Sequence, residues 1–254
     1  MKLNYIVEGE GKTLIFIHGL SDDLRYWEIL TSSLKNNYKI IRIDLRGHGE
    51  SELGADEICI NTYANDLKKI LDELKIEKAN VIGFSLGGAV AIDFAIRYPD
   101  YVSSLVLMST FLKCDDYLSK LFSQFKEELN KSFEDFFDFM IEKVLCPEVI
   151  EKNREELEIL KQISSQNTNL EAYEKAVDAC INFNAEKSIS NINVPTLILA
   201  GKYDEIIPLD KQKLIHKSIS SSDLIVFDDV RHNLLVRKNN AEIIKILNNF
   251  YKNH

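Results

Sequence analysis

The most reactive candidate in the sequence is Ser85, which stands at the centre of the motif GFSLG (residues 83–87), with Gly88 directly after it. An apolar run typical of a strand precedes the motif, and a helical pattern follows it. A strand-to-helix turn this tight strains the serine backbone and requires small residues two positions to either side. The turn exposes the hydroxyl at a helix N-terminus, which favours developing negative charge. The motif therefore predicts a nucleophilic serine.

A serine hydroxyl is a poor nucleophile without a base, and the chain offers five histidines. His232 lies in a loop between the last predicted strand and the last predicted helix, from which it can reach across the strand ends. The others stand at a strand end, in a turn, within a helical pattern and at the last position: His18, His48, His216 and His254. We therefore expect His232 to take the proton from Ser85.

An acidic residue should orient the imidazole and stabilise its charged form. Asp204 ends a run that reads as a strand and a loop, one strand–helix unit before His232, which gives the chain order Ser, Asp, His. Five other acidic residues are alternatives for this role. Glu205 is adjacent to Asp204, Asp228 and Asp229 follow the last predicted strand, and Asp115 and Asp116 follow the strand before the helical block. We prefer Asp204 over all of them.

An acyl-transfer site also needs hydrogen-bond donors for the oxyanion. The backbone N–H of Leu86, the residue after the nucleophile, is one candidate. The second should come from the loop that follows the strand at Thr13–Ile17, where the N–H of Leu20 is our candidate. Both are main-chain donors, so their side chains are free to vary.

Short apolar runs alternate with helical patterns on both sides of a central block. The predicted strands are Leu3–Val7, Thr13–Ile17, Lys39–Ile43, Asn80–Phe84, Ser104–Met108, Thr196–Ala200 and Asp223–Phe227. The predicted helices between them are Tyr26–Lys35, Tyr63–Leu74, Leu86–Arg97, Leu209–Ile219 and Ala241–Phe250. This alternation predicts an α/β fold with a doubly wound, mostly parallel β-sheet flanked by helices.

The central block, residues 111–190, contains none of the ten glycines and eight of the thirteen phenylalanines. Its apolar residues recur with helical spacing and indicate three or four amphipathic helices, with Ser132 as an N-cap and Pro147 as an interruption. We expect an all-helical insertion between two strands of a core made of residues 1–110 and 191–254. Its place, beyond a strand's carboxyl end, is where ligands bind in such sheets.

The composition of the 254 residues, 45% hydrophobic and 28% charged, is that of an ordinary globular protein. The net charge of −9 argues against nucleic acid and anionic membranes as partners. The longest apolar runs have four residues, and the first residues lack a signal-peptide pattern, so we expect a cytoplasmic protein. The four cysteines show no C-x2-C spacing, which argues for free thiols in a reducing compartment rather than zinc or thioredoxin-type chemistry.

Five segments together resemble the α/β-hydrolase fold superfamily, in its order and over essentially the whole chain: His18-Gly19, DLRGHGES (44–51), GFSLGG (83–88), Asp204 and His232. The chain looks like a carboxylesterase-like member with a serine nucleophile. The resemblance implies that Arg46 and His48 belong to a structural turn, that the block 111–190 is a cap over Ser85, and that neither metal nor cofactor is needed. Relatives often have glycine before the base histidine. Here Arg231 either brings a cation to the site or, as we favour, points to solvent.

The substrate is less defined than the chemistry. Dehalogenases and epoxide hydrolases of this superfamily use an aspartate nucleophile, so Ser85 argues against both. Ala89 stands where the menaquinone-pathway synthase has an arginine, which argues against that lyase. An apolar stripe of the cap is expected to contribute to substrate binding: Phe122, Phe125, Phe136, Phe137 and Met140.

We therefore predict hydrolysis of small or medium carboxylic esters through an acyl-enzyme. The alternatives are a C–C bond hydrolase, a lactonase, a lyase or a slow-turnover small-molecule receptor. The expected partner is a small ester-like molecule, and the chain is expected to be a monomer or a homodimer.

Overall fold

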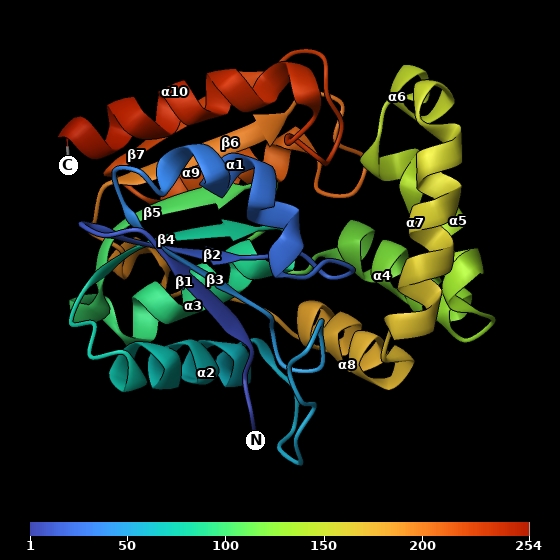
Figure 1. The fold of residues 1–254 in the computed structure, drawn as a ribbon, viewed down its shortest axis with the longest axis horizontal. Helices are drawn as coiled ribbons and strands as arrows, with labels where there is room; N and C mark the ends of the chain where they lie inside the picture. Colours follow the sequence, from blue (N-terminus) through green and yellow to red (C-terminus); the bar gives the residue numbers. More distant parts are fainter. Residues whose placement is uncertain (254) are drawn as a thin grey trace.

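The computed structural model describes residues 1–253, apart from the side chain of Arg237; His254 lies outside the described residues. Seven strands form one sheet in the order β1-β3-β2-β4-β5-β6-β7 (Figure 1). The edge strand β1 pairs antiparallel with β3, and all the other neighbouring strands are parallel. The strands are β1 (Tyr5–Glu8), β2 (Thr13–Ile17), β3 (Lys39–Ile43), β4 (Ala79–Phe84), β5 (Val102–Met108), β6 (Thr196–Gly201) and β7 (Ser222–Phe227). The prediction of a doubly wound, mostly parallel sheet is confirmed.

Helices cover both faces of this sheet because its central strands are apolar on both faces. In β2, for example, Ile15 packs into one core cluster and Phe16 into the other. The first cluster lies under α2 (Ile60–Glu73), α3 (Leu86–Arg97) and α9 (Leu209–Ser218), and the second under α1 (Glu28–Leu34) and α10 (Arg237–Asn253). The first predicted helix is divided, since a 3-10 turn at Leu24–Trp27 precedes α1.

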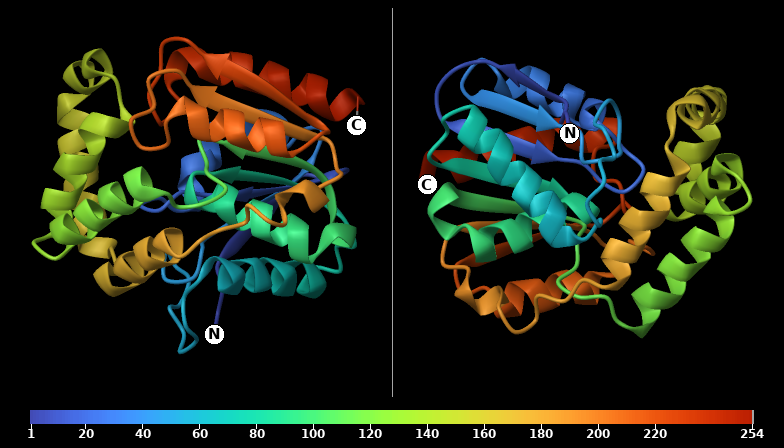
Figure 2. Two further views of the ribbon diagram at one scale, coloured as in Figure 1. Left: turned by 180° about the vertical axis from the view of Figure 1, so that it is seen from behind. Right: turned by 90° about the horizontal axis from the view of Figure 1, so that it is seen from below.

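A helical insertion, α4 to α8, lies between β5 and β6, beyond the arrowheads of the strands (Figures 1 and 2). Its helices are α4 (Asp116–Leu129), α5 (Phe133–Val144), α6 (Pro147–Lys152), α7 (Arg154–Asn167) and α8 (Leu170–Ile181). The predicted N-cap is confirmed, because the Ser132 hydroxyl accepts a 3.0 Å hydrogen bond from the Asp135 N–H.

The expectation of three or four helices in this insertion is wrong, because the described residues form five. Pro147 does not only interrupt the pattern; it also begins α6. Proline suits the first position of a helix, where its fixed φ is already helical and its missing N–H would have no partner. In the described part of the chain, no helix has the length and hydropathy needed to cross a membrane.

The segment 44–51 forms a turn beneath the helical insertion that is buried except at Gly49 and Glu50. Gly47 has φ +75°, and a Cβ there would lie 2.4 Å from the Ala172 Cβ of α8, so this position needs glycine. The Arg46 guanidinium is fully buried and donates to both oxygens of Asp66, at 2.8 and 3.0 Å, and to Asp56 at 3.0 Å. These bonds support the structural role that the resemblance implies for Arg46.

Removing this buried arginine should destabilise the fold strongly. In Arg46→Ala the buried Asp66 carboxylate loses its buried partner and keeps only the exposed Lys69 at 3.1 Å, and we expect a loss of about 3–5 kcal/mol in the free energy of unfolding. Urea denaturation followed by circular dichroism measures it. Arg154→Ala, which removes an exposed ion pair with Glu151, is the control and should cost less than about 1 kcal/mol. Equal losses in the two variants would contradict the structural role of Arg46.

Candidate active site

Ser85 stands at the sharp turn between β4 and α3. Its backbone has φ 52° and ψ −116°, a strained conformation for a residue with a side chain. The turn closes so tightly that a Cβ on Gly83 would lie 2.3 Å from the Gly87 carbonyl oxygen. Ser85 is half-buried although the residues on either side of it are buried. The predicted elbow geometry is therefore present at this serine.

The dipeptide Ser109-Thr110, which follows β5, holds both halves of the site. The Ser85 N–H donates to the Met108 carbonyl at 2.9 Å, and the Thr110 hydroxyl donates to the Ser85 carbonyl at 2.7 Å. The adjacent Ser109 hydroxyl donates to the His232 carbonyl at 2.9 Å. Ser109 is fully buried and has φ +47°, a second strained serine. Two neighbouring side chains thus fix the serine turn and the histidine loop to one strand end.

His232 is paired with Asp204, as expected. The Asp204 Oδ2 lies 2.8 Å from the His232 Nδ1, and both residues are buried. The other carboxylate oxygen of Asp204 accepts the N–H groups of Ile206 at 2.9 Å and Ile207 at 2.8 Å, which fixes the orientation of the carboxylate. The His232 ring also packs on Phe84, the residue before Ser85, with ring centroids 4.9 Å apart.

The alternative acids have other partners. Glu205 forms an ion pair with Arg231, Asp228 with Lys202 and Asp229 with Lys238. Asp115 caps α4 and pairs with Lys211, and Asp116 lies in the first turn of that helix. Because only Asp204 of this group is bonded to the His232 ring among the described contacts, the geometry favours it as the orienting acid.

The loop of residues 18–20 lies against the start of α3. A Cβ on Gly87 would come within 2.2 Å of the Ile17 carbonyl oxygen and 2.5 Å of that of His18, so glycine permits this close approach. The N–H of Leu20 and that of Leu86, the first residue of α3, are thereby presented from two neighbouring segments. Their role as oxyanion donors stays a prediction.

Two buried histidines orient this loop. His18 Nε2 lies 3.0 Å from the Leu45 N–H and accepts from it, so we assign the ring proton to Nδ1, which donates to the Gly19 carbonyl at 2.7 Å. His48 Nε2 lies 2.7 Å from the Leu20 carbonyl and is assigned as its donor. Burial is the main cause that lowers the pKa of each ring to about 4, so both imidazoles are neutral at neutral pH.

The expectation that Arg231 points to solvent is wrong. Its side chain is only 21% exposed, forms a 3.0 Å ion pair with Glu205 and donates to the Glu142 carbonyl near the end of α5. On the other side of the base, the Asn233 N–H donates to the Val144 carbonyl at 3.1 Å. Cations and N–H groups satisfy the last carbonyls of a helix, so α5 holds the loop that carries His232 from both sides.

The phenylalanines of the predicted substrate-binding stripe are buried within the helical insertion and its junction with the core. Phe125 packs on Phe122 and Phe136, with centroids 5.9 and 5.5 Å apart, and Phe137 packs on Phe133. This packing explains the stripe without a ligand, so the substrate-binding role of these residues stays a prediction. Met140 is half-buried, and its sulfur accepts from the Ser21 hydroxyl at 3.1 Å, beside the 18–20 loop.

Sequence reasoning missed one group at the site, the half-buried carboxyl of Asp22. Burial raises its pKa to about 7, Asp23 adds to that rise, and His232 and a hydrogen bond from the Gly19 backbone oppose it. An acidic pair directly after a predicted oxyanion loop was the available signal. Ser109 gave no such signal, because its strain depends on the packed strands around it.

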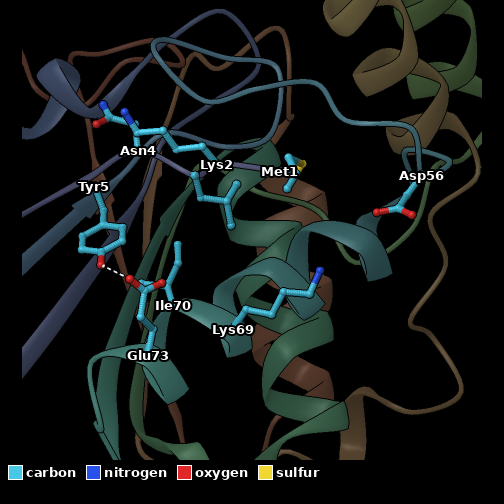
Figure 3. A pocket seen from close by; sticks show the side chains of 9 residues that line it. Met1, Lys2, Asn4, Tyr5, Asp56, Lys69, Ile70 and Glu73 are labelled. Carbon is cyan, nitrogen blue, oxygen red and sulfur yellow. Dashed lines mark hydrogen bonds between the residues drawn. The ribbon is translucent and has the colours of Figure 1, made fainter.

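Two grooves lie away from the serine. One of about 910 Å³ passes between α6 and the loops after β6 and β7, with Asp204 in its wall. Another of about 670 Å³ lies between the N-terminal segment and α2, where the Tyr5 hydroxyl donates to Glu73 (Figure 3). Among the described residues, no three His, Cys, Asp or Glu side chains are grouped as metal ligands would be.

A doubly wound sheet with a strained serine between a central strand and its helix is the architecture of the nucleophile-elbow hydrolases. The chain belongs to the alpha/beta hydrolase fold family, whose model matches residues 12–238. YisY of Bacillus subtilis, an AB hydrolase superfamily protein, is 30% identical over 238 residues, which cover 88% of this chain and 86% of YisY.

Solved structures agree on the fold. MGS-M2, an alpha/beta hydrolase enzyme from a Medee basin deep-sea metagenome library, is similar with a TM-score of 0.92 at 19% identity, over 98% of this chain and 94% of its own. The enol-lactonase of Burkholderia xenovorans is similar with a TM-score of 0.90 at 20% identity, over 98% and 96%. At these identities the likeness establishes the shared fold.

The buried histidines should make stability depend on pH. The pKa of His48 is 6.5 in the unfolded chain and about 4 in the folded protein. Between pH 6.5 and pH 4 the unfolded ring binds a proton that the folded ring does not, so the stability contributed by the buried ring is lost as the pH falls. We expect the unfolding free energy of the wild type, relative to His48→Gln, to fall by about 3 kcal/mol between pH 7 and pH 4.

Urea titrations at several pH values measure this slope. The unfolding free energy of His48→Gln is subtracted from that of the wild type because Asp22 also titrates. The raised pKa of folded Asp22 makes its contribution to stability change with pH in the opposite direction to that of His48, and this contribution is the same in both proteins and cancels. His216→Gln, which changes an exposed histidine of α9, is the control. Parallel curves for the wild type and His48→Gln would contradict a buried neutral ring.

Proposed function

We propose that this hydrolase cleaves small or medium carboxylic esters through an acyl-enzyme, with Ser85 as nucleophile, His232 as base and Asp204 as the acid that orients the base. The observation that carries the proposal is the strained Ser85 turn beside a buried Asp204–His232 pair. A strained, half-buried serine costs stability and is characteristic of a functional position. The pair comes from the loops after β6 and β7, and Phe84, the residue before Ser85 on β4, packs on the His232 ring.

The mechanism follows from the hydrogen bonds. Because His232 Nδ1 is bonded to Asp204, its Nε2 is the nitrogen that can take the proton from the Ser85 hydroxyl. Ser85 Oγ attacks the ester carbonyl carbon, and the N–H groups of Leu20 and Leu86 stabilise the oxyanion. As the adduct collapses, His232 protonates the leaving alcohol. Water, deprotonated by His232, then cleaves the acyl-enzyme and restores Ser85.

The helical insertion would serve as the cap of this site. It lies beyond the carboxyl ends of the strands, and its helix α5 contacts the loops on both sides of His232. Its interior is apolar and aromatic, which suits an uncharged acyl or alcohol group. A lactone is an internal ester and would follow the same steps, so lactonase activity is the nearest alternative.

Removing the nucleophile should abolish turnover. We expect Ser85→Ala to lower kcat for p-nitrophenyl acetate, butyrate or octanoate by about 10⁴-fold or more, because the acyl-enzyme cannot form. Release of p-nitrophenolate over many cycles measures the rate, and the acyl chain that is hydrolysed fastest indicates the size of the acyl pocket. Ser123→Ala, an exposed serine of α4, is the control. Turnover that survives in Ser85→Ala would exclude this mechanism, and no turnover in the wild type would favour a lyase or receptor.

The choice of acid can be tested separately. Asp204→Asn should lower kcat by about 10⁴-fold, because the amide no longer selects the tautomer with a proton on Nδ1. Asp228→Asn, which removes an exposed carboxylate paired with Lys202, is the matched control and should change kcat less than twofold, within the scatter of about 0.5 kcal/mol for surface changes. A loss below tenfold in Asp204→Asn would show that another residue orients the base.

A further inference from the structure

Asp22 lies in the loop that carries the proposed oxyanion donor, two residues after Leu20. Its Oδ2 lies 2.7 Å from the point that a Cβ on Gly19 would occupy, and the same point is 3.0 Å from the Phe84 ring. Phe84 precedes Ser85 and packs on His232, and the charge of His232 acts on the Asp22 carboxyl. Asp22 therefore lies beside the groups to which we assign the chemistry.

The Asp22 carboxylate has no permanent cation as a partner; His232 is the group whose charge favours its ionised form. Among the side chains that the structure describes, no lysine or arginine forms an ion pair with it, whereas its neighbour Asp23 is bonded to Arg25. The charge of Asp23 disfavours ionised Asp22 further. A half-buried, partly desolvated carboxylate with no permanent cation beside it is costly, and a positively charged ligand would remove that cost.

A purely local role does not account for the carboxyl group. The Gly19 backbone supplies one hydrogen bond to Asp22, and serine, threonine or asparagine at this place could accept the same bond without bringing a charge into the site. Placed beside a developing oxyanion, a carboxylate opposes the negative charge. Its presence is therefore explained better by a group that the substrate brings.

The surroundings of Asp22 suit a cation. Tyr26 and Tyr173 lie close enough for the Asp22 charge to act on their hydroxyls, and Tyr26 stacks on Phe84 with centroids 4.7 Å apart. Aromatic rings beside a carboxylate attract positively charged nitrogen. The net charge of −9 adds a long-range attraction for cations.

We propose that Asp22 is a specificity-determining residue whose carboxylate pairs with a positively charged nitrogen that the substrate carries a few bonds from the scissile carbonyl. The proposal rests on the proposed ester hydrolysis and narrows its substrates to cationic esters. The nitrogen neutralises Asp22 while the oxyanion forms, so the carboxylate favours cationic substrates and disfavours neutral ones.

Two isosteric pairs of esters test this at pH 8, where Asp22 is mostly ionised. Methyl 3-aminopropanoate against methyl butyrate places the charge on the acyl side, and butyrylcholine against 3,3-dimethylbutyl butyrate places it on the alcohol side. In the wild type, kcat/KM should favour the cationic ester of at least one pair by about tenfold or more. In Asp22→Asn this ratio should fall about tenfold or more, with a rise on the neutral ester.

Asp23→Asn is the matched control, because it removes a carboxylate from the same loop that already has Arg25 as its partner, and because Asp22 is already mostly ionised at pH 8 in the presence of Asp23. In Asp23→Asn the ratio of kcat/KM for the cationic ester to kcat/KM for the neutral ester should stay within threefold of the wild-type ratio. Asn is isosteric with Asp and relieves a buried charge, and thermal unfolding verifies that the variants are folded. No cationic preference in either pair, or a preference that Asp22→Asn retains, would overturn the assignment of Asp22.

Binding separates this proposal from the proposed hydrolysis. Calorimetry with butyrylcholine and methyl 3-aminopropanoate on Ser85→Ala requires no turnover, and adding Asp22→Asn should weaken the binding of the preferred ester about tenfold or more. Binding that depends on Asp22, found in a chain without esterase activity, would support the cation site and reject the hydrolysis. Ser85-dependent turnover without an effect of Asp22 would support the hydrolysis and reject the cation site.

Discussion

The positive φ of Ser85 is a constraint that extends well beyond the serine. A turn this tight brings the Gly83 and Gly87 backbones together and lets the start of α3 approach the end of β2, so no larger residue fits at either position. That approach sets the distance between the serine and the 18–20 loop. The loop is then oriented by His18 and His48, which are neutral because they are buried. The strain at one residue is thus balanced by the packing of three neighbouring segments.

Much of this arrangement is predictable from local patterns. The sequence predicts all seven strands, and the central ones are the clearest, since parallel strands covered on both faces leave a continuous apolar signal. The order Ser85, Asp204, His232 follows from motif and chain order, and the Asp204–His232 hydrogen bond agrees with it. The number of helices in the insertion was underestimated, because Pro147 starts a helix at the place where it was expected only to interrupt one.

Other features depend on contacts between distant segments and leave no local signal. Arg231 looked like a surface residue in sequence, but Glu142 and Glu205, which bind it, are far away along the chain. The strain of Ser109 arises where β5 meets the histidine loop. Asp22 is noticeable in sequence only as one of an acidic pair after the predicted oxyanion loop, and its position beside Phe84 depends on the folded chain.

The bonds from Arg231 and Asn233 to the end of α5 have a mechanical consequence. They attach the helical insertion to the two residues that flank His232, so a displacement of α5 from the core breaks two supports of this loop at the same time, whereas the bonds from Ser109 and Asp204 do not depend on α5. The position of the insertion and that of the His232 loop are therefore coupled through two residues that lie outside the Asp204–His232 pair.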